Sequence, residues 1–241
     1  MQDRCRRAED LGYDVVAVAD HLDMPAPFPA LVSAAAVTSR PRLSAFVLNA
    51  AFYNPALLAR DLATTDQLTD GRIDAALGAG HVEAEFRAAG LPFPSARERV
   101  DHLERTVLEI RRLFADPSHA PRPRQERMPL TIGGNGDRVL RFAARHADTV
   151  ALSGAAPGTG PGRHRLVGRA ELAQRVRFVR DRTAGRDSAP DINLLIHAVA
   201  ASGSRRDVAA RLRRFDDAEL TVPEPAMETF APVMARLDRR T

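Results

Sequence analysis

Short apolar segments with strand character alternate with helical segments along most of this chain. The strand-like segments carry β-branched or aromatic residues, and most segments between them place apolar residues at three- and four-residue spacing. This alternation is typical of a parallel sheet covered by helices. The predicted strands cover residues 13–20, 42–50, 72–80, 128–134, 147–154 and 191–200, with a short seventh strand near Leu220.

Cap and turn residues mark where the helices begin and end. Gly12 stands where a C-terminal cap is expected after the first helix, and Asn54 with Pro55 supplies an N-cap and a first-turn proline. Residues 117–129 and 153–164 are rich in proline or glycine and predict loops, while 81–95 predicts an irregular segment. The predicted helices cover residues 1–11, 31–39, 54–68, 96–114, 135–146, 169–183 and 204–215, followed by a last helix.

The length of the chain favours a single core. With 241 residues, 44% of them hydrophobic, one sizeable core can form, and barrels of this length are commonly one domain. We therefore predict one α/β domain over residues 1–241, a TIM-barrel-like (β/α)₈ fold. A closed barrel of this kind uses eight strands, so we expect this one to have only seven strands of its own.

No segment predicts insertion into a membrane or export. The apolar runs are shorter than the roughly eighteen residues of a membrane span, and MQDRCRRAED contains no apolar stretch of a signal peptide. We therefore expect a cytoplasmic protein. The single cysteine, Cys5, excludes an internal disulfide and a cysteine-rich zinc site.

The basic residues exclude some classes of function. All 35 are arginines, and the absence of lysine excludes enzymes that form a Schiff base through lysine. The net charge is only +4, arginines alternate with acidic residues, and two tyrosines without tryptophan leave little surface for stacking bases. We expect a small-molecule substrate rather than nucleic acid.

Polar groups follow two of the predicted strands directly. In a parallel barrel the working groups lie at the carboxyl ends of the strands. Asp20 and His21 end the strand 13–20 and can exchange protons or donate hydrogen bonds, although a plain polar turn would look the same. Asn49 ends the next strand, and the segment 49–54 offers an amide and apolar atoms to a planar ring.

Two glycine-rich turns follow later strands. Gly78 and Gly80 allow a ligand to approach the backbone closely, and His81 can act as acid, base or anion contact. A second turn leads from a strand into a helix, where free N–H groups, the positive end of the helix dipole and a guanidinium favour phosphate. The residues of this second turn are Gly133, Gly134, Asn135, Gly136 and Arg138. A tight loop with a surface arginine is the ordinary alternative.

Three blocks of sequence together resemble the luciferase-like monooxygenase superfamily. They are AEDLGYDVVAVADHL, NPALLARDLATTDQLTDGRIDAALGAG and PLTIGGNGDRVLRFAARHADTVAL, in the family's order and spacing. The resemblance is strongest to the actinobacterial branch that uses the deazaflavin coenzyme F420. It implies a (β/α)₈ barrel that binds F420 or FMN with the ring in the barrel mouth, and an oxidoreductase that transfers hydride to or from a small organic substrate.

The resemblance also implies roles for individual residues. Asp20 and His21 fall where relatives place an Asp-His pair near the reactive ring carbon. His21 would donate or accept the proton, and Asp20 would hold the His21 side chain in place. Phe46 and Val47 fall at a non-proline cis peptide behind the ring. The Gly133 to Arg138 turn falls at a phosphate-binding loop. His81 replaces the catalytic glutamate of sugar-phosphate-oxidising relatives, which does not support that activity.

Several departures from the family keep other functions open. Relative to the family, this chain lacks the first strand and parts of the insertion and of the C-terminal region. These differences favour a second hypothesis: a redox-inactive flavin-binding subunit, or a cofactor-free isomerase or cyclase. A third hypothesis is a metal-dependent hydrolase whose ligands are Asp20, His21, His81 and Glu83. Small and apolar residues on several faces of helices 31–38 and 54–68 predict a homodimer or heterodimer, and relatives pair through this region.

Overall fold

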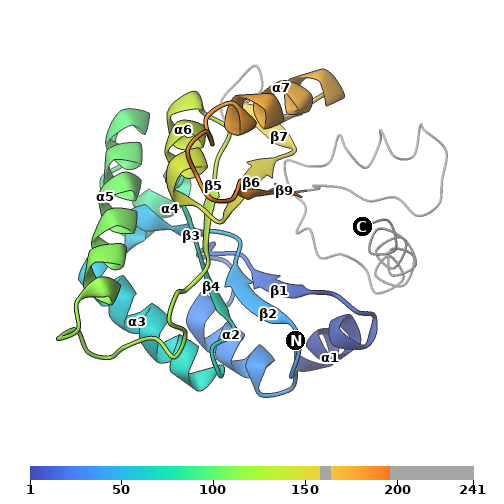
Figure 1. Ribbon diagram of the computed structural model, residues 1–241, viewed down its shortest axis with the longest axis vertical. Coiled ribbons are helices and arrows are strands. Elements are labelled where there is room, and N and C mark those ends of the chain that lie inside the picture. The colour runs from blue at the N-terminus through green and yellow to red at the C-terminus, as the bar shows by residue number, and fades with distance from the viewer. Residues whose placement is uncertain (158–163, 196–241) are drawn as a thin grey trace.

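A curved parallel sheet forms the centre of the molecule (Figure 1). The structure is a computed structural model and describes residues 1–157 and 164–195. The strands lie in the order β1-β2-β4-β5-β6-β9, with the short β3 beside β4. Their bounds are β1 Val15–Val18, β2 Arg42–Ala45, β3 Leu48–Asn49, β4 Ile73–Gly78, β5 Leu130–Gly133, β6 Thr149–Ser153 and β9 Asp191–Leu195.

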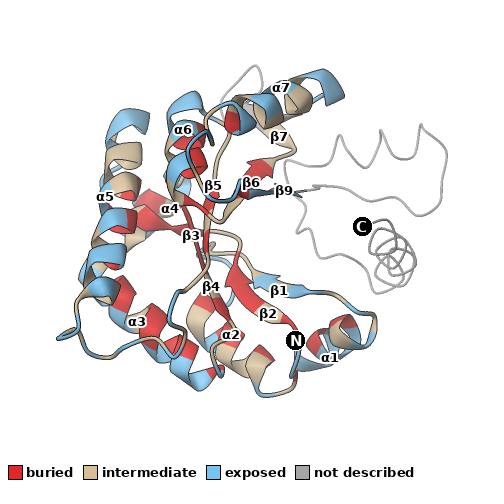
Figure 2. Ribbon diagram, viewed as in Figure 1, coloured by how far each residue is buried: buried red, intermediate tan, exposed pale blue. Residues whose placement is uncertain are grey.

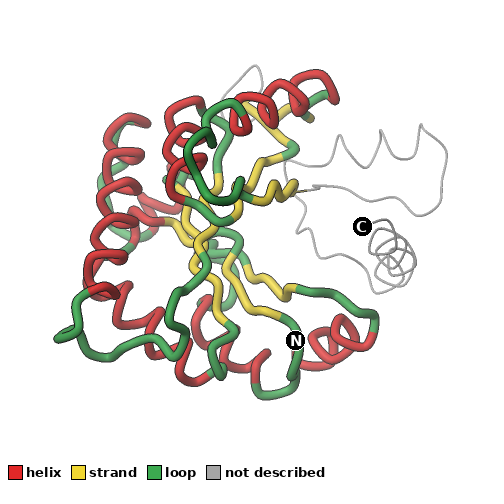
Figure 3. Tube along the Cα trace, in the orientation of Figure 1, coloured by secondary structure: helices red, strands yellow, loops and turns green. Residues whose placement is uncertain are grey.

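The helices form an arc along the outer side of this sheet, which gives the described part the shape of a half-barrel (Figures 1 and 3). This confirms the predicted α/β class and the TIM-barrel-like arrangement. The helices are α1 Gln2–Asp10, α2 Pro27–Ala35, α3 Pro55–Leu68, α4 Glu83–Ala88, α5 Ala96–Ala115, α6 Asp137–His146 and α7 Arg169–Arg180, with a 3₁₀ turn η1 at Ala50–Phe52.

The core lies between the sheet and the inner faces of these helices (Figure 2). Leu62 on α3 and Leu103 on α5 are nearly inaccessible to solvent, as are Leu77 on β4 and Ile132 on β5. Each such side chain stabilises the fold by about 1.5–3 kcal/mol relative to an exposed position. The apolar spacing that predicted the helices therefore also identifies the faces that pack on the strands.

The helix starts follow local sequence signals. The side chain of Asn54 accepts hydrogen bonds from the N–H groups of Ala56 and Leu57 at the start of α3, as predicted. At α5, Ser95 and Glu98 form a reciprocal capping box. Both caps satisfy N–H groups that have no partner within the helix.

Two segments differ from the prediction. The stretch 81–95, expected to be irregular, contains α4, a helix too short to show a full apolar period. The stretch 153–164, expected to be a loop, contains β7 Ala155–Pro157 and ends at the start of β8 His164–Leu166, and these two strands form a small antiparallel sheet. The predicted strand near Leu220, helix 204–215 and last helix lie outside the described residues.

Within the described residues, β1 and β9 each pair on one side only, so these strands do not close a barrel. Six of the seven predicted strands are present, and the segment 42–50 is divided into β2 and β3. None of the helices described at 1–157 and 164–195 is long and apolar enough to cross a membrane.

Candidate active site

The strand register brings several predicted site residues to one level of the sheet. Asn49 on β3 is the register partner of Gly78 on β4, and Gly78 is the partner of Gly133 on β5. Gly133 is in turn opposite Ala151 on β6. All of them lie at or near the carboxyl ends of their strands, which is the edge where barrel enzymes place their working groups.

Asp20 is held at this edge by two donors. Its Oδ2 accepts a hydrogen bond from the N–H of Asn49 at 2.9 Å and another from the hydroxyl of Tyr53 at 3.2 Å. Burial raises the pKa of Asp20, and the two hydrogen bonds offset this only in part. Burial and the Asp20 charge raise the pKa of Tyr53 as well, which keeps its hydroxyl a donor. Asp20 therefore fixes the end of β1 against β3.

His21 has a different partner from the predicted one. Its Nδ1 lies 2.6 Å from Oε1 of Glu85, whose side chain is 17% exposed, while the side chain of His21 is 39% exposed. The prediction that Asp20 holds His21 is therefore wrong: Glu85, on α4, does. This pairing leaves Nε2 of His21 as the ring nitrogen available to a substrate.

A cis peptide bond joins Phe46 to Val47, at the position that the family resemblance implies. The side chain of Val47 then lies against the ends of β4 and β5. A Cβ atom added to Gly78 would lie 2.7 Å from Cγ2 of Val47, and one added to Gly133 would lie 3.1 Å from Cγ1. Both glycines are thus required for packing around Val47, in addition to any role toward a ligand.

The turn after β4 is supported by side chains on both sides. Gly80 has φ +72°, and a Cβ atom there would lie only 2.2 Å from Oδ1 of the buried Asn49. Arg99 on α5 donates from Nε to the carbonyl of Gly80 at 3.0 Å and stacks over the ring of Phe93. His81, next in the chain, is exposed. The turn is held rigidly while His81 reaches solvent.

Sequence reasoning missed the residues that support the site from neighbouring helices. His102 on α5, for example, donates from Nε2 to the carbonyl of Ala50 at 2.9 Å and so fixes η1. Such residues are remote in sequence from the groups they hold, and no motif surrounds them. The missed residues on helices are Glu85, Arg99 and His102. Tyr53 lies in the predicted segment 49–54, but its hydrogen bond to Asp20 was not predicted.

The turn from β5 into α6 is tied to the neighbouring strand. Nδ2 of Asn135 donates to the carbonyls of Ser153 and Ala155, and its Oδ1 accepts from the N–H of Ser153 at 3.0 Å. Asn135 thus connects β5 to β6. The N-cap of α6 is Gly136, which has no side chain to cap the helix, and a Cβ atom added there would meet nothing within 4 Å. The first N–H groups of α6 thus receive no side-chain cap.

Arg138 lies one turn into α6 and forms ion pairs with α5. Its guanidinium is 2.6 Å from Oδ1 of Asp101 and 2.7 Å from Oε2 of Glu104, and its side chain is 42% exposed. The hydrogen bonds to Glu104 and Asp101 raise the pKa of Arg138 above its usual value. Arg138 is therefore near the α6 N-terminus, as predicted, but it already has two carboxylate partners.

The geometry gives no support to a metal-dependent hydrolase. In the ranges 1–157 and 164–195, no group of three or more His, Cys, Asp or Glu side chains is placed to hold a metal ion. Glu83, one of the four candidate ligands, forms instead an exposed ion pair with Arg87 within α4.

The chain is similar to several dehydrogenases from actinobacteria. It is 33% identical over 171 residues to an F420-dependent glucose-6-phosphate dehydrogenase of Intrasporangium calvum, and 34% identical over 174 residues to one of Kribbella flavida. Each alignment covers 61% of this chain and 51% of the relative. The chain thus spans about half the length of the curated relatives it matches.

Solved structures show the same fold. A monooxygenase from Streptomyces bottropensis superposes with a TM-score of 0.71 at 22% identity, covering 99% of this chain and 74% of that one. An F420-dependent secondary alcohol dehydrogenase in complex with an F420-acetone adduct gives a TM-score of 0.69 at 21% identity, covering 96% and 76%. The family model for luciferase-like monooxygenases matches residues 1–221. The chain therefore belongs to the luciferase-like monooxygenase family.

Proposed function

We propose that this protein is an oxidoreductase that transfers hydride between coenzyme F420 or FMN and a small organic substrate. The observation that carries the proposal is the His21–Glu85 pair at the carboxyl edge of the sheet, because it is an oriented acid-base group beside the strand ends where barrels bind ligands. The relatives named for F420 favour that coenzyme, although FMN fits the same proposal.

The residues at this edge fit such a cofactor. The α6 N-terminus lacks a side-chain cap and offers N–H groups to a phosphate. Val47, Asn49 and the Gly80 turn present apolar atoms and an amide at the neighbouring strand ends. We assign the ring to Phe46, Val47, Asn49, Gly78, Gly80 and His81, and the phosphate to Gly133, Gly134, Asn135, Gly136 and Arg138. The bound cofactor would supply the hydride chemistry.

The protein's own part of the reaction is to hold and move one proton. Glu85 accepts the hydrogen bond from Nδ1 of His21, which fixes the ring and keeps Nε2 available to a substrate. In this geometry Nε2 donates a proton to the substrate oxygen or accepts one from it, according to the direction of hydride transfer. Asp20, which is bonded to Asn49 and Tyr53, positions the β1 end and carries no proton in this scheme.

Titration of the protein with F420 and with FMN tests the proposal. We expect saturable binding of at least one of them, followed by a change in its absorbance when a panel of alcohols is added. Arg138→Ala should weaken cofactor binding roughly tenfold, because a charge-assisted contact to phosphate is lost. Its melting temperature without cofactor should fall only slightly, since the ion pairs are partly exposed.

Arg141→Ala, an exposed arginine one turn further along α6, is the matched control and should leave affinity unchanged. If Arg138→Ala binds the cofactor as tightly as the wild type does, Arg138 only forms ion pairs with α5, and other residues must contact the phosphate. If neither cofactor binds at high micromolar concentration, the oxidoreductase proposal fails in favour of a redox-inactive family member.

We further propose a cytoplasmic dimer. Leu57 and Leu68 on α3 are 52% and 62% exposed, and Leu108 on α5 is 48% exposed, so apolar side chains remain uncovered on two neighbouring helices. Light scattering at tens of micromolar should give twice the mass of the chain, and Leu57→Glu together with Leu68→Glu should shift it toward the monomer. A monomeric mass for the wild-type protein would contradict this.

A further inference from the structure

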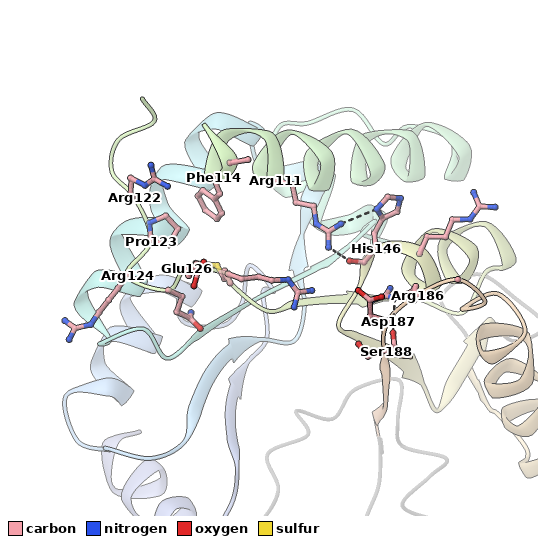
Figure 4. A pocket seen from close by; sticks show the side chains of 16 residues that line it. Arg111, Phe114, Arg122, Pro123, Arg124, Glu126, His146, Arg186, Asp187 and Ser188 are labelled. Atoms are coloured by element: carbon pink, nitrogen blue, oxygen red, sulfur yellow. Dashed lines mark hydrogen bonds between the residues drawn. The ribbon is translucent and has the colours of Figure 1, made fainter. Parts of the chain in front are cut away.

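A cavity of about 880 Å³ lies at the opposite end of the sheet from the candidate active site. Its walls come from the end of α5, residues 122–128 before β5, the end of α6 and residues 185–188 before β9 (Figure 4). These segments precede strands, so the cavity is at the amino ends, and none of the proposed cofactor residues lines it. In barrels this end contributes to stability rather than to catalysis.

Arginine dominates the lining of this cavity. Two carboxylates, Glu126 and Asp187, also face it, so positive charge is in clear excess. The guanidinium group is the protein's best donor to phosphate, since its planar fork matches two oxygens at once. The six arginines are Arg111, Arg122, Arg124, Arg127, Arg145 and Arg186.

Most of these arginines lack a carboxylate partner. Arg124 pairs with Asp70 at 3.2 Å, and Arg127 pairs with Asp148. Within the part of the chain that the structure describes, the other four form no ion pair. Arg111, Arg122 and Arg186 donate hydrogen bonds to backbone carbonyls instead, and Arg111 also donates to His146. The carboxylate of Asp148 acts on Arg111 only at a distance.

Three of the four arginines without an ion pair surround His146. Arg111 donates to Nδ1 of His146 at 3.3 Å and to its carbonyl oxygen (Figure 4). Burial, and then the charges of Arg111, Arg145 and Arg186, lower the pKa of His146. Burial also lowers the pKa of Arg111; the Asp148 carboxylate opposes this shift, and the charges of Arg127 and Arg186 add to it. Like charges held this close repel one another, and an anion between them would remove that repulsion.

The cavity also has an apolar wall. Phe114, Met128 and Pro123 line it together with the arginines. In Figure 4, Arg111 and Arg186 lie on the His146 side, whereas Arg122 and Arg124 lie on the other. The volume falls within the roughly 300–1,000 Å³ of small-molecule sites, larger than a single phosphate requires.

We propose that this cavity is a second ligand site that binds a phosphorylated small molecule of nucleotide size carrying at least two negative charges. The phosphates contact the arginines around His146, and the apolar part packs on Phe114 and Met128. Because the cavity lies at the amino ends of the strands, this ligand acts apart from the hydride-transfer site. The proposal does not depend on which cofactor, if any, that site binds.

Calorimetric titration with ADP and with inorganic pyrophosphate tests the second site. Both should bind saturably with one site per chain, and ADP should bind more tightly than pyrophosphate. Arg145→Ala should weaken both by roughly tenfold, because a charge-assisted contact is lost. Arg145 is exposed and forms no ion pair in the described residues, so the variant should fold normally.

The matched control is Arg105→Ala, which removes an exposed arginine of the same helix as Arg111, outside the cavity. Its affinity for ADP should equal that of the wild type, and Arg145→Lys should restore part of the loss. Three results would overturn the proposal: no saturable binding of either probe, equal weakening by Arg105→Ala, or displacement of ADP by FMN or F420. Tighter binding of a single-stranded oligonucleotide than of ADP would also overturn it, because the cavity would then serve nucleic acid.

Discussion

His21→Ala should lower the turnover number by about 10²–10⁴-fold while cofactor affinity changes little. The reason is that His21 is the oriented acid-base group at the carboxyl edge, whereas the cofactor contacts assigned above come from residues 46–49, from the end of β4 and the turn after it, and from the turn between β5 and α6. The measurement is kcat with the alcohol that the substrate panel identifies, alongside the cofactor dissociation constant. Stability should be nearly unchanged, since the His21 side chain is 39% exposed.

Glu85→Gln separates positioning from proton transfer. The amide keeps a hydrogen bond to His21 but loses the charge, so we expect a smaller loss in kcat, roughly tenfold, with little change in KM. Glu109→Gln, an exposed glutamate paired with Arg112 on α5, is the matched control and should leave both constants unaltered. Unchanged kcat in His21→Ala would remove His21 from the mechanism, and a change in KM alone in Glu85→Gln would make Glu85 a binding residue.

The architecture could be predicted from the sequence because its signals are local. Alternating strand and helix patterns, together with Asn54 before Pro55, mark elements whose ends depend on neighbouring residues only. Where the local signal is weak, the prediction failed. The helix α4 spans only Glu83–Ala88, so no apolar period could reveal it. Its absence from the prediction also hid Glu85, the partner of His21.

The features of the candidate site also differ in how far the sequence could predict them. The cis bond between Phe46 and Val47 was expected from the family resemblance and is present. The ion pairs of Arg138 could not be predicted, because Asp101 and Glu104 come from another helix whose rotation is set by packing. The arginine cavity is a still clearer case, since the ends of α5 and α6 and the segments 122–128 and 185–188 converge only in the folded chain.

Gly80→Ala should destabilise the protein by about 3 kcal/mol, more than any surface change considered above. Two costs combine at this position. The backbone has φ +72°, which an L-residue adopts at a cost of about 1 kcal/mol, and the new Cβ would lie 2.2 Å from Oδ1 of Asn49. Asn49 is buried and accepts from the N–H of Ala51, so it cannot move without losing that bond.

Gly90→Ala isolates the backbone cost, because Gly90 has a similar φ of +70° but nothing within 4 Å of the added atom. Chemical denaturation of this variant should show a loss of only about 1 kcal/mol. In the double variant Asn49→Ala with Gly80→Ala, the new Cβ at position 80 no longer meets the Asn49 side chain. Its loss of unfolding free energy should therefore be about 1–2 kcal/mol smaller than the sum of the losses in the two single variants. If the two effects simply add, the close approach of Asn49 to Gly80 does not determine the turn. The glycine would then be required for its φ value or for a ligand, which the cofactor titration of Gly80→Ala would separate.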